Sequence, residues 1–143
     1  KAFKENAKYL SRATLKRLTV ENDEFGVGLY ALENIGFPIV LDVHHHFVNT
    51  GVWPTDKEFE FVLPSWNRTP KLHYSYPKFC ELKKGWPVFE GSRTKLRMHS
   101  DTYNNKTVNK WILEKAKKYG FDIMCEAKHK DVARNQLFKF LEK

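Results

Sequence analysis

The fold is decided by the stretch Pro38-Ile39-Val40-Leu41-Asp42-Val43-His44-His45-His46, in which a short apolar run leads directly into polar residues. Short apolar runs that end in this way are typical of strands buried on both faces, as in parallel sheets. Three other stretches have the same character: residues 18–20, 70–75 and 121–125. The sequence therefore predicts four buried strands.

Helical patterns alternate with these strands. Helices are expected over residues 4–11, 29–35 and 105–119 and after residue 130. Gly36 and Gly120 follow two of them, where glycine commonly ends a helix. Residues 76–95, which include glycine and proline, are predicted to form a long loop. Because strands and helices alternate without a repeat or a linker, we expect one α/β domain with a parallel sheet over residues 1–143.

Composition excludes several classes of protein. The 143 residues are 41% hydrophobic and 15% aromatic, too apolar for a disordered chain. No apolar run approaches the roughly 20 residues of a membrane helix, and the first residues lack the apolar stretch of a secretory signal. Two cysteines, Cys80 and Cys125, are too few for a disulfide scaffold and indicate a reducing, intracellular compartment. The formal charge of +8 favours an anionic partner such as nucleic acid, although many soluble enzymes carry as much charge.

Polar residues gather where the predicted strands end. In α/β barrels, the carboxyl ends of the strands carry the active site. The residues there that are able to bind a metal are Glu21, Asp42, His45, His73, His99 and Glu126. Their carboxylate oxygens and imidazole nitrogens suit Zn²⁺, Mn²⁺ or Fe²⁺, and two or more such ions can activate water and clamp a phosphodiester. Lys71 lies two residues before His73, on the same face of its strand, where it would stabilise negative charge on a phosphate.

Each of these residues also has a structural interpretation. Glu21 and Glu126 each suit a carboxylate that caps the next helix or pairs with a lysine. A histidine triplet is often a solvated loop, and spacing alone does not separate His45 from its neighbours His44 and His46. His129 has no evident partner and is expected at the surface. Because residues able to bind a metal follow all four predicted strands, the metal site is favoured over these alternatives.

Five motifs resemble those of UV damage endonucleases, in the order of that family. Residues 18–24 resemble its "ENDE" strand, and residues 38–46 its "PVVLDxHHH" segment. Residues 68–75 are similar to "RPKxHxS", residues 97–101 to "RxHxD", and residues 122–128 to "DxMxEAK". Because all five occur in order along most of the chain, the match is specific.

The resemblance implies a metal-dependent TIM-type barrel that nicks DNA on the 5′ side of UV photoproducts, leaving a 3′-hydroxyl and a 5′-phosphate. It implies up to three divalent ions, with Mn²⁺ preferred and Zn²⁺ or Mg²⁺ as alternatives. Position by position, it makes metal ligands of Glu21, Asp42, His45, His73, His99 and Glu126. It makes Lys71 the catalytic lysine beside the ions, which in this family can be carboxylated.

The motifs match only the later half of the family's pattern. A complete (β/α)₈ barrel takes roughly 250 residues. We therefore expect a partial TIM-type barrel of about the last four β/α units. Such a chain would be a fragment, or would pair with the missing N-terminal half or with another copy of itself. Two other functions stay open: an apurinic-site endonuclease-like barrel, and a fragment that binds DNA or a partner without cutting.

Contacts to damaged double-stranded DNA are expected from basic residues after the strands. The candidates for phosphate contact are Lys83, Lys84, Arg93 and Lys95, for which a solvated loop is the equal alternative. Trp86 and Phe89 have the chemistry to stack on bases, or else pack against the barrel.

Overall fold

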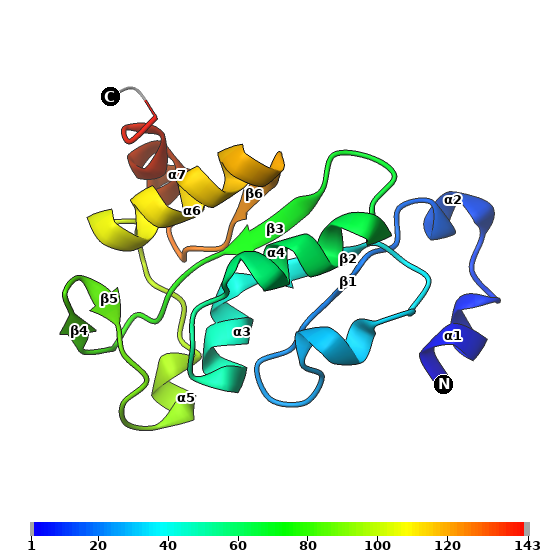
Figure 1. The fold of residues 1–143 in the computed structure, drawn as a ribbon, viewed down its shortest axis with the longest axis horizontal. Helices are drawn as coiled ribbons and strands as arrows, with labels where there is room; N and C mark the ends of the chain where they lie inside the picture. The colour runs from blue at the N-terminus through cyan, green and yellow to red at the C-terminus, as the bar shows by residue number, and fades with distance from the viewer. Residues whose placement is uncertain (1, 142–143) are drawn as a thin grey trace.

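Four strands form one parallel sheet in the computed structural model, which describes residues 2–141. The expected domain ends, residue 1 and residues 142–143, lie outside the described residues. The strands lie in the sheet in chain order and are β1 (Val20–Glu21), β2 (Ile39–Asp42), β3 (Lys71–Tyr74) and β6 (Asp122–Cys125) (Figure 1). The prediction of an α/β fold with four parallel strands is confirmed.

The sheet has one covered face and one open face. Leu41, Leu72 and Tyr74 are fully buried on the face that meets the helices. On the other face, Met124 stays 46% exposed, and burial alternates along β3 and β6. Burial of the strands on both faces was therefore a correct expectation for β2 only. Side chains on the open face of β3 and β6 are therefore partly accessible.

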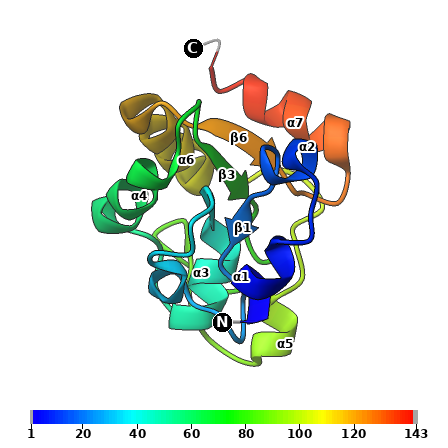
Figure 2. The ribbon, with the colours of Figure 1, turned by 90° about the vertical axis from the view of Figure 1, so that its right-hand side faces the viewer.

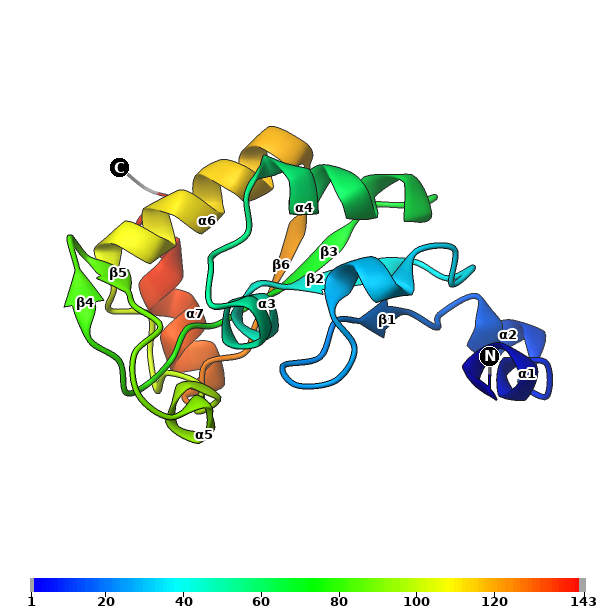
Figure 3. The same cartoon turned by 60° about the horizontal axis from the view of Figure 1, so that its bottom comes forward.

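Helices after β2 and β3 cover the outer face of the sheet. The chain passes from β2 into α3 (Val43–Thr50), α4 (Asp56–Val62) and η2 (Leu63–Ser65), and α6 (Lys106–Tyr119) precedes β6. Figures 2 and 3 show α4 and α6 on the same side of the strands. Phe59 of α4 and Ile112 of α6 are fully buried there with Leu72. This packing supports the strands that carry the site.

Two predicted helices agree closely with the structure. The helix expected over residues 105–119 is α6, which begins after Asn105, whose side chain accepts a hydrogen bond from the Val108 N–H. It ends at Gly120 in the left-handed conformation. The last helix is α7 (Lys130–Phe138), which buries Ala133 and Leu137.

Two other predicted helices are wrong in detail. Residues 4–11 do not form one helix: α1 (Ala2–Ala7) ends in a turn, and Ser11 caps a second short helix, α2 (Arg12–Leu15). Residues 29–35 form only a 3₁₀ helix, η1 (Leu29–Leu32), because the backbone turns left-handed at Asn34.

The histidine triplet lies in a helix that the apolar pattern did not predict. The Asp42 side chain accepts a hydrogen bond from the His45 N–H at 2.7 Å and caps α3, which ends at Gly51. Helix α4 was also missed, although Thr55 and Glu58 form a capping box at its start.

The segment 76–95 is not a plain loop. It contains an antiparallel hairpin of β4 (Leu82–Lys83) and β5 (Trp86–Pro87), and α5 (Arg93–Leu96) begins near its end. The hairpin turns at Gly85, whose φ is 84° and where an added Cβ would lie 2.2 Å from Thr107 Oγ1.

Trp86 and Phe89 both take part in aromatic packing. The Trp86 ring lies 5.8 Å from the Trp53 ring and 5.4 Å from the Trp111 ring. The Phe89 ring lies 5.8 Å from that of Phe47. Of the two alternatives for this pair, the structure therefore favours packing against the barrel over base stacking. In the described part of the chain, no helix combines the length and apolarity needed to cross a membrane.

Candidate metal centre

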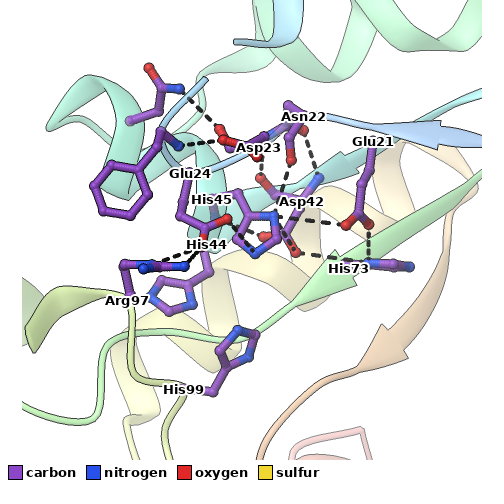
Figure 4. A network of polar contacts seen from close by, with 12 residues as sticks. Glu21, Asn22, Asp23, Glu24, Asp42, His44, His45, His73, Arg97 and His99 are labelled. Atoms are coloured by element: carbon purple, nitrogen blue, oxygen red, sulfur yellow. Dashed lines mark hydrogen bonds and ion pairs between the residues drawn. The ribbon is translucent and has the colours of Figure 1, made fainter. Parts of the chain in front are cut away.

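Four neighbouring strands deliver acidic and imidazole groups to one point. Glu21 ends β1, Asp42 ends β2, His73 lies in β3, and Glu126 follows β6. Ligand atoms of Glu21, Asp42 and His73 all lie within 4.8 Å of one another. The pairing of Asp42 with His73 across β2 and β3 places both side chains on the same face of the sheet, where they point toward each other (Figure 4).

His73 Nδ1 is the centre of this cluster. It lies 2.7 Å from Glu21 Oε2, 3.0 Å from Glu126 Oε1 and 3.8 Å from Asp42 Oδ2. None of these approaches has the geometry of a hydrogen bond, and His73 Nδ1 and Asp42 Oδ2 are both buried without a hydrogen-bond partner. Buried polar atoms without partners are rare in folded proteins. Their convergence with two further carboxylates fits a divalent cation that takes oxygen and nitrogen ligands.

The cluster also perturbs the proton affinities of its members. Burial raises the pKa of Asp42 to about 7, although His45 and His73 act in the opposite direction. Burial lowers the pKa of His73, but Glu126 and Glu21 outweigh it and raise the value to about 10. Burial acts to raise the pKa of Glu126, and the contact with His73 more than offsets it, so that this pKa is lowered. A proton and a cation therefore compete for the same atoms.

His45 and His99 stand beside this cluster with their tautomers determined. His45 Nδ1 donates to the carbonyl oxygen of Asn22 at 3.0 Å, and His99 Nδ1 donates to that of Glu126 at 3.0 Å. Because a carbonyl only accepts hydrogen bonds, Nδ1 carries a proton in each ring, and Nε2 is the nitrogen with which each ring would bind a metal. The two rings are 6.1 Å apart.

The other two histidines of the triplet point into the protein. His44 is fully buried, and its Nε2 donates to the Leu96 carbonyl oxygen at 2.7 Å. Burial lowers its pKa to about 3, so the ring is neutral, and its edge packs on the His99 ring at 4.8 Å. His46 is also buried. His129 is exposed, as predicted.

All 143 residues match the family model described as UV-endonuclease UvdE. The chain belongs to this family. Relatives include UV DNA damage endonucleases of Bacillus cereus. That of strain 03BB102 is 32% identical over 148 residues, covering 97% of this chain and 42% of the relative. That of strain B4264 is 30% identical over 145 residues, covering 94% of this chain and 41% of the relative.

A solved structure of the UvdE family has the same fold. The structure titled "Crystal Structure of SacUVDE" superposes with a TM-score of 0.73 at 26% identity, over 98% of this chain and 44% of that one. The chain thus spans about two fifths of the length of the curated relatives it matches. The expected fold class, a partial TIM-type barrel, is confirmed. The relatives favour the UV damage interpretation over the apurinic-site alternative.

Two further residues, Asn22 and Glu24, contact the candidate ligands, although the sequence did not single them out. Asn22 is fully buried and bonds to the main chain of Asp42. Glu24 Oε2 lies 3.5 Å from His45 Nε2, and its other oxygen accepts from Arg97 at 2.5 Å. Arg97 in turn lies over the Phe25 ring at 4.4 Å. Asn22 and Glu24 both lie in the polar run after β1 that resembles the "ENDE" motif, but this run did not indicate their separate roles.

Lys71 and the basic loop residues differ in their surroundings. Lys71 Nζ lies 3.1 Å from Asp122 Oδ2. Lys71 comes two residues before His73 in β3, so the two side chains share one face of the strand. The four residues predicted to contact DNA are all exposed: Lys83, Lys84, Arg93 and Lys95. Within residues 2–141, none of the four takes part in an ion pair, while Arg93 also lies over the Phe89 ring at 5.7 Å.

Proposed function

We propose that this chain carries part of the active site of a divalent-metal-dependent endonuclease that nicks DNA on the 5′ side of UV photoproducts, leaving a 3′-hydroxyl and a 5′-phosphate. The single observation that carries the proposal is the pair of buried, unpartnered atoms, Asp42 Oδ2 and His73 Nδ1, among carboxylates from adjacent strand ends. The names of the relatives, UV DNA damage endonucleases, support the choice of substrate.

The proposed ligands form two groups. Glu21, Asp42, His73 and Glu126 would hold one cation around His73 Nδ1. His45 and His99 would bind through Nε2 beside them, with Glu24 as a further carboxylate facing His45. The mixture of oxygen and nitrogen donors suits Mn²⁺, with Zn²⁺ or Mg²⁺ as alternatives, and up to three ions in the complete site. When bound, a divalent cation supplies a water of lowered pKa and neutralises charge on the phosphate.

The chain's own residues would position the substrate. We propose Lys71 as the catalytic lysine, because it projects from the same face of β3 as His73. We propose that Lys83, Lys84, Arg93 and Lys95 contact phosphates. The hairpin and α5, which carry these four, lie beyond the carboxyl ends of the strands (Figure 1). The formal charge of +8 supports attraction to damaged double-stranded DNA.

The proposed partner is the part of the barrel that the longer relatives contain and that lies outside the region matched by this chain. A groove of about 1480 Å³ runs along β6, α6 and α7, lined in part by the apolar side chains of Leu113, Phe121, Ile123 and Leu137. Among residues 2–141, β6 pairs with β3 alone, so its other edge lacks a strand partner there. We propose that the missing half of the barrel covers this groove, with a second copy of the chain as the alternative. We further propose that residues 1–143 act as one domain and that the protein is intracellular.

The experiment is a nicking assay joined to a binding measurement. An end-labelled duplex with one cyclobutane pyrimidine dimer is incubated with Mn²⁺ and the chain, alone or with the remaining barrel segment of a relative. A single cut directly 5′ to the dimer, lost in Glu126→Gln and retained in the exposed control Glu114→Gln, is expected. Electron paramagnetic resonance measures Mn²⁺ binding in the same samples. A chain that binds no Mn²⁺, or a cut that survives Glu126→Gln, would refute the proposal.

A further inference from the structure

The hydroxyl of Tyr103 lies at the end of β6, where the chain turns toward Glu126. It donates to the Tyr74 carbonyl oxygen at 2.6 Å and accepts from the N–H groups of Glu126 and Ala127 at 2.9 and 3.1 Å. A phenol has one donor and two acceptor lone pairs, so all of its hydrogen-bonding capacity is used here. The Glu126 N–H also donates directly to the Tyr74 carbonyl oxygen, at 3.0 Å. The hydroxyl therefore reinforces this contact between β3 and Glu126 and adds a second one, to Ala127, beyond the last paired residues of the two strands.

The Tyr103 ring is enclosed by its neighbours at this position. It is 1% exposed and stacks on the Tyr74 ring, 4.7 Å away at an interplanar angle of 10°. Its backbone is held as well: the N–H donates to Gln136 Oε1 at 3.1 Å, and the carbonyl accepts from Asn109 Nδ2 at 2.8 Å. Asn109 Oδ1 accepts from the Tyr74 hydroxyl at 2.6 Å and closes the cluster.

Two candidate ligands depend on the backbone that this hydroxyl holds. Glu126 directs its carboxylate toward His73 Nδ1, with Oε1 at 3.0 Å. The Glu126 carbonyl oxygen accepts from His99 Nδ1 and so sets the tautomer that leaves His99 Nε2 unprotonated. A rotation of the peptide at Glu126 would therefore disturb the carboxylate and the imidazole together.

We propose that Tyr103 is a positioning residue of the metal centre, whose hydroxyl holds the Glu126 main chain so that the Glu126 carboxylate and His99 Nε2 both face the site. Tyr103 contacts neither cation nor DNA in this role and acts only through Glu126. The inference rests on the proposed function of the site. The hydrogen bonds by which Tyr103 holds Glu126 do not depend on that function.

The test is Tyr103→Phe, which keeps the buried ring and removes only the hydroxyl. The matched control is Tyr76→Phe, since the Tyr76 hydroxyl is also buried and bonded, to the 102–105 segment and not to Glu126. Long-range ¹H–¹⁵N spectra of metal-free protein at alkaline pH report the tautomer of His99. The ring signals of His99 are identified by their loss in the variant His99→Asn. We expect the Nδ1-protonated form in wild type and Tyr76→Phe, and a mixture of tautomers in Tyr103→Phe.

Mn²⁺ affinity supplies the second measurement. We expect Tyr103→Phe to weaken binding about tenfold, as loss of a group that orients a ligand commonly does, and Tyr76→Phe to stay within about twofold of wild type. An unchanged His99 tautomer, or equal Mn²⁺ affinities in the two variants, would overturn the proposal. If the wild type binds no Mn²⁺, the proposed function fails while the tautomer comparison still decides the role of Tyr103.

A third measurement covers the case in which Tyr103→Phe does not fold. In wild-type protein, the Tyr103 hydroxyl proton is expected as a slowly exchanging signal with cross-peaks to the amide protons of Glu126 and Ala127. Rapid exchange of this proton, with no such cross-peaks, would contradict the arrangement on which the proposal depends.

Discussion

The Asn22 carboxamide makes two hydrogen bonds to the main chain of Asp42. Asn22 Nδ2 donates to the Asp42 carbonyl oxygen at 2.9 Å, and the Asp42 N–H donates to Asn22 Oδ1 at 2.9 Å. Both residues are fully buried. A side chain just after β1 therefore replaces the backbone hydrogen bonds that a longer strand would make to Asp42. It thereby sets the position of Asp42, whose carboxylate belongs to the cluster around His73.

We predict that Asn22→Ala lowers the free energy of unfolding by about 1–3 kcal/mol, because it removes two buried hydrogen bonds and leaves the Asp42 N–H without its partner. Cation affinity should fall as well. Urea unfolding and Mn²⁺ titration measure the two effects. Asn49→Ala is the control, since its side chain bonds only to the Asp23 carbonyl oxygen at an exposed position. Equal losses in both variants would contradict a special role for Asn22.

Asp42→Asn should separate stability from function. The raised pKa of Asp42 means that its ionisation destabilises the fold as pH rises from its unfolded value toward about 7. An amide removes this cost and still accepts from the His45 N–H. In metal-free protein at about pH 8, we expect Asp42→Asn to be more stable than wild type by about 1–3 kcal/mol, with little difference below about pH 4.

The same variant should lose the stabilisation that a cation provides. Adding Mn²⁺ should raise the melting temperature of wild type and leave that of Asp42→Asn unchanged, because a neutral amide replaces a carboxylate ligand. Thermal unfolding with and without Mn²⁺ measures this. A variant that is less stable than wild type at alkaline pH and still responds to Mn²⁺ would contradict both expectations.

Cation binding should release protons, and more of them at lower pH. The pKa of Asp42 is about 7 and that of His73 about 10, both above their ordinary values, whereas a metal requires the deprotonated forms. We expect release of about two protons per cation near pH 6 and about one near pH 8, with affinity rising over this range. Calorimetry in buffers of different ionisation enthalpy measures the number. Binding without proton release at the lower pH would show that these two groups do not bind the cation.

The exposed lysines of the hairpin should contribute to DNA affinity through charge alone. We expect the double variant Lys83→Gln, Lys84→Gln to weaken binding to duplexes of any sequence and to reduce the slope of log affinity against log salt by about one per lost phosphate contact. Lys110→Gln, at an exposed position on α6 and paired only with Glu114, is the control. An unchanged salt slope in the double variant would remove the hairpin from the proposed DNA interface.

Much of the fold follows from local patterns in the sequence. The apolar run that ends in Asp42 predicts a buried strand, and three similar runs predict the other three strands of the parallel sheet. Asn105 and Gly120 mark the ends of α6 because caps act within one turn of the backbone. Strand ends of a parallel sheet lie on one edge, so the meeting of Glu21, Asp42 and His73 was also predictable.

Other features were decided by tertiary structure alone. The triplet contains three identical residues, and only the direction of α3 determines that His45 faces the cluster while His44 and His46 are buried. Tyr103 lies 23 residues from Glu126 along the chain, and their hydrogen bond forms only because β6 and the segment before α6 pack together. The sequence by itself therefore determined the strands and the types of ligand they carry, because hydrophobic period and capping are local. The packing decided which side chains hold those ligands in place, because such contacts join residues with no local relation.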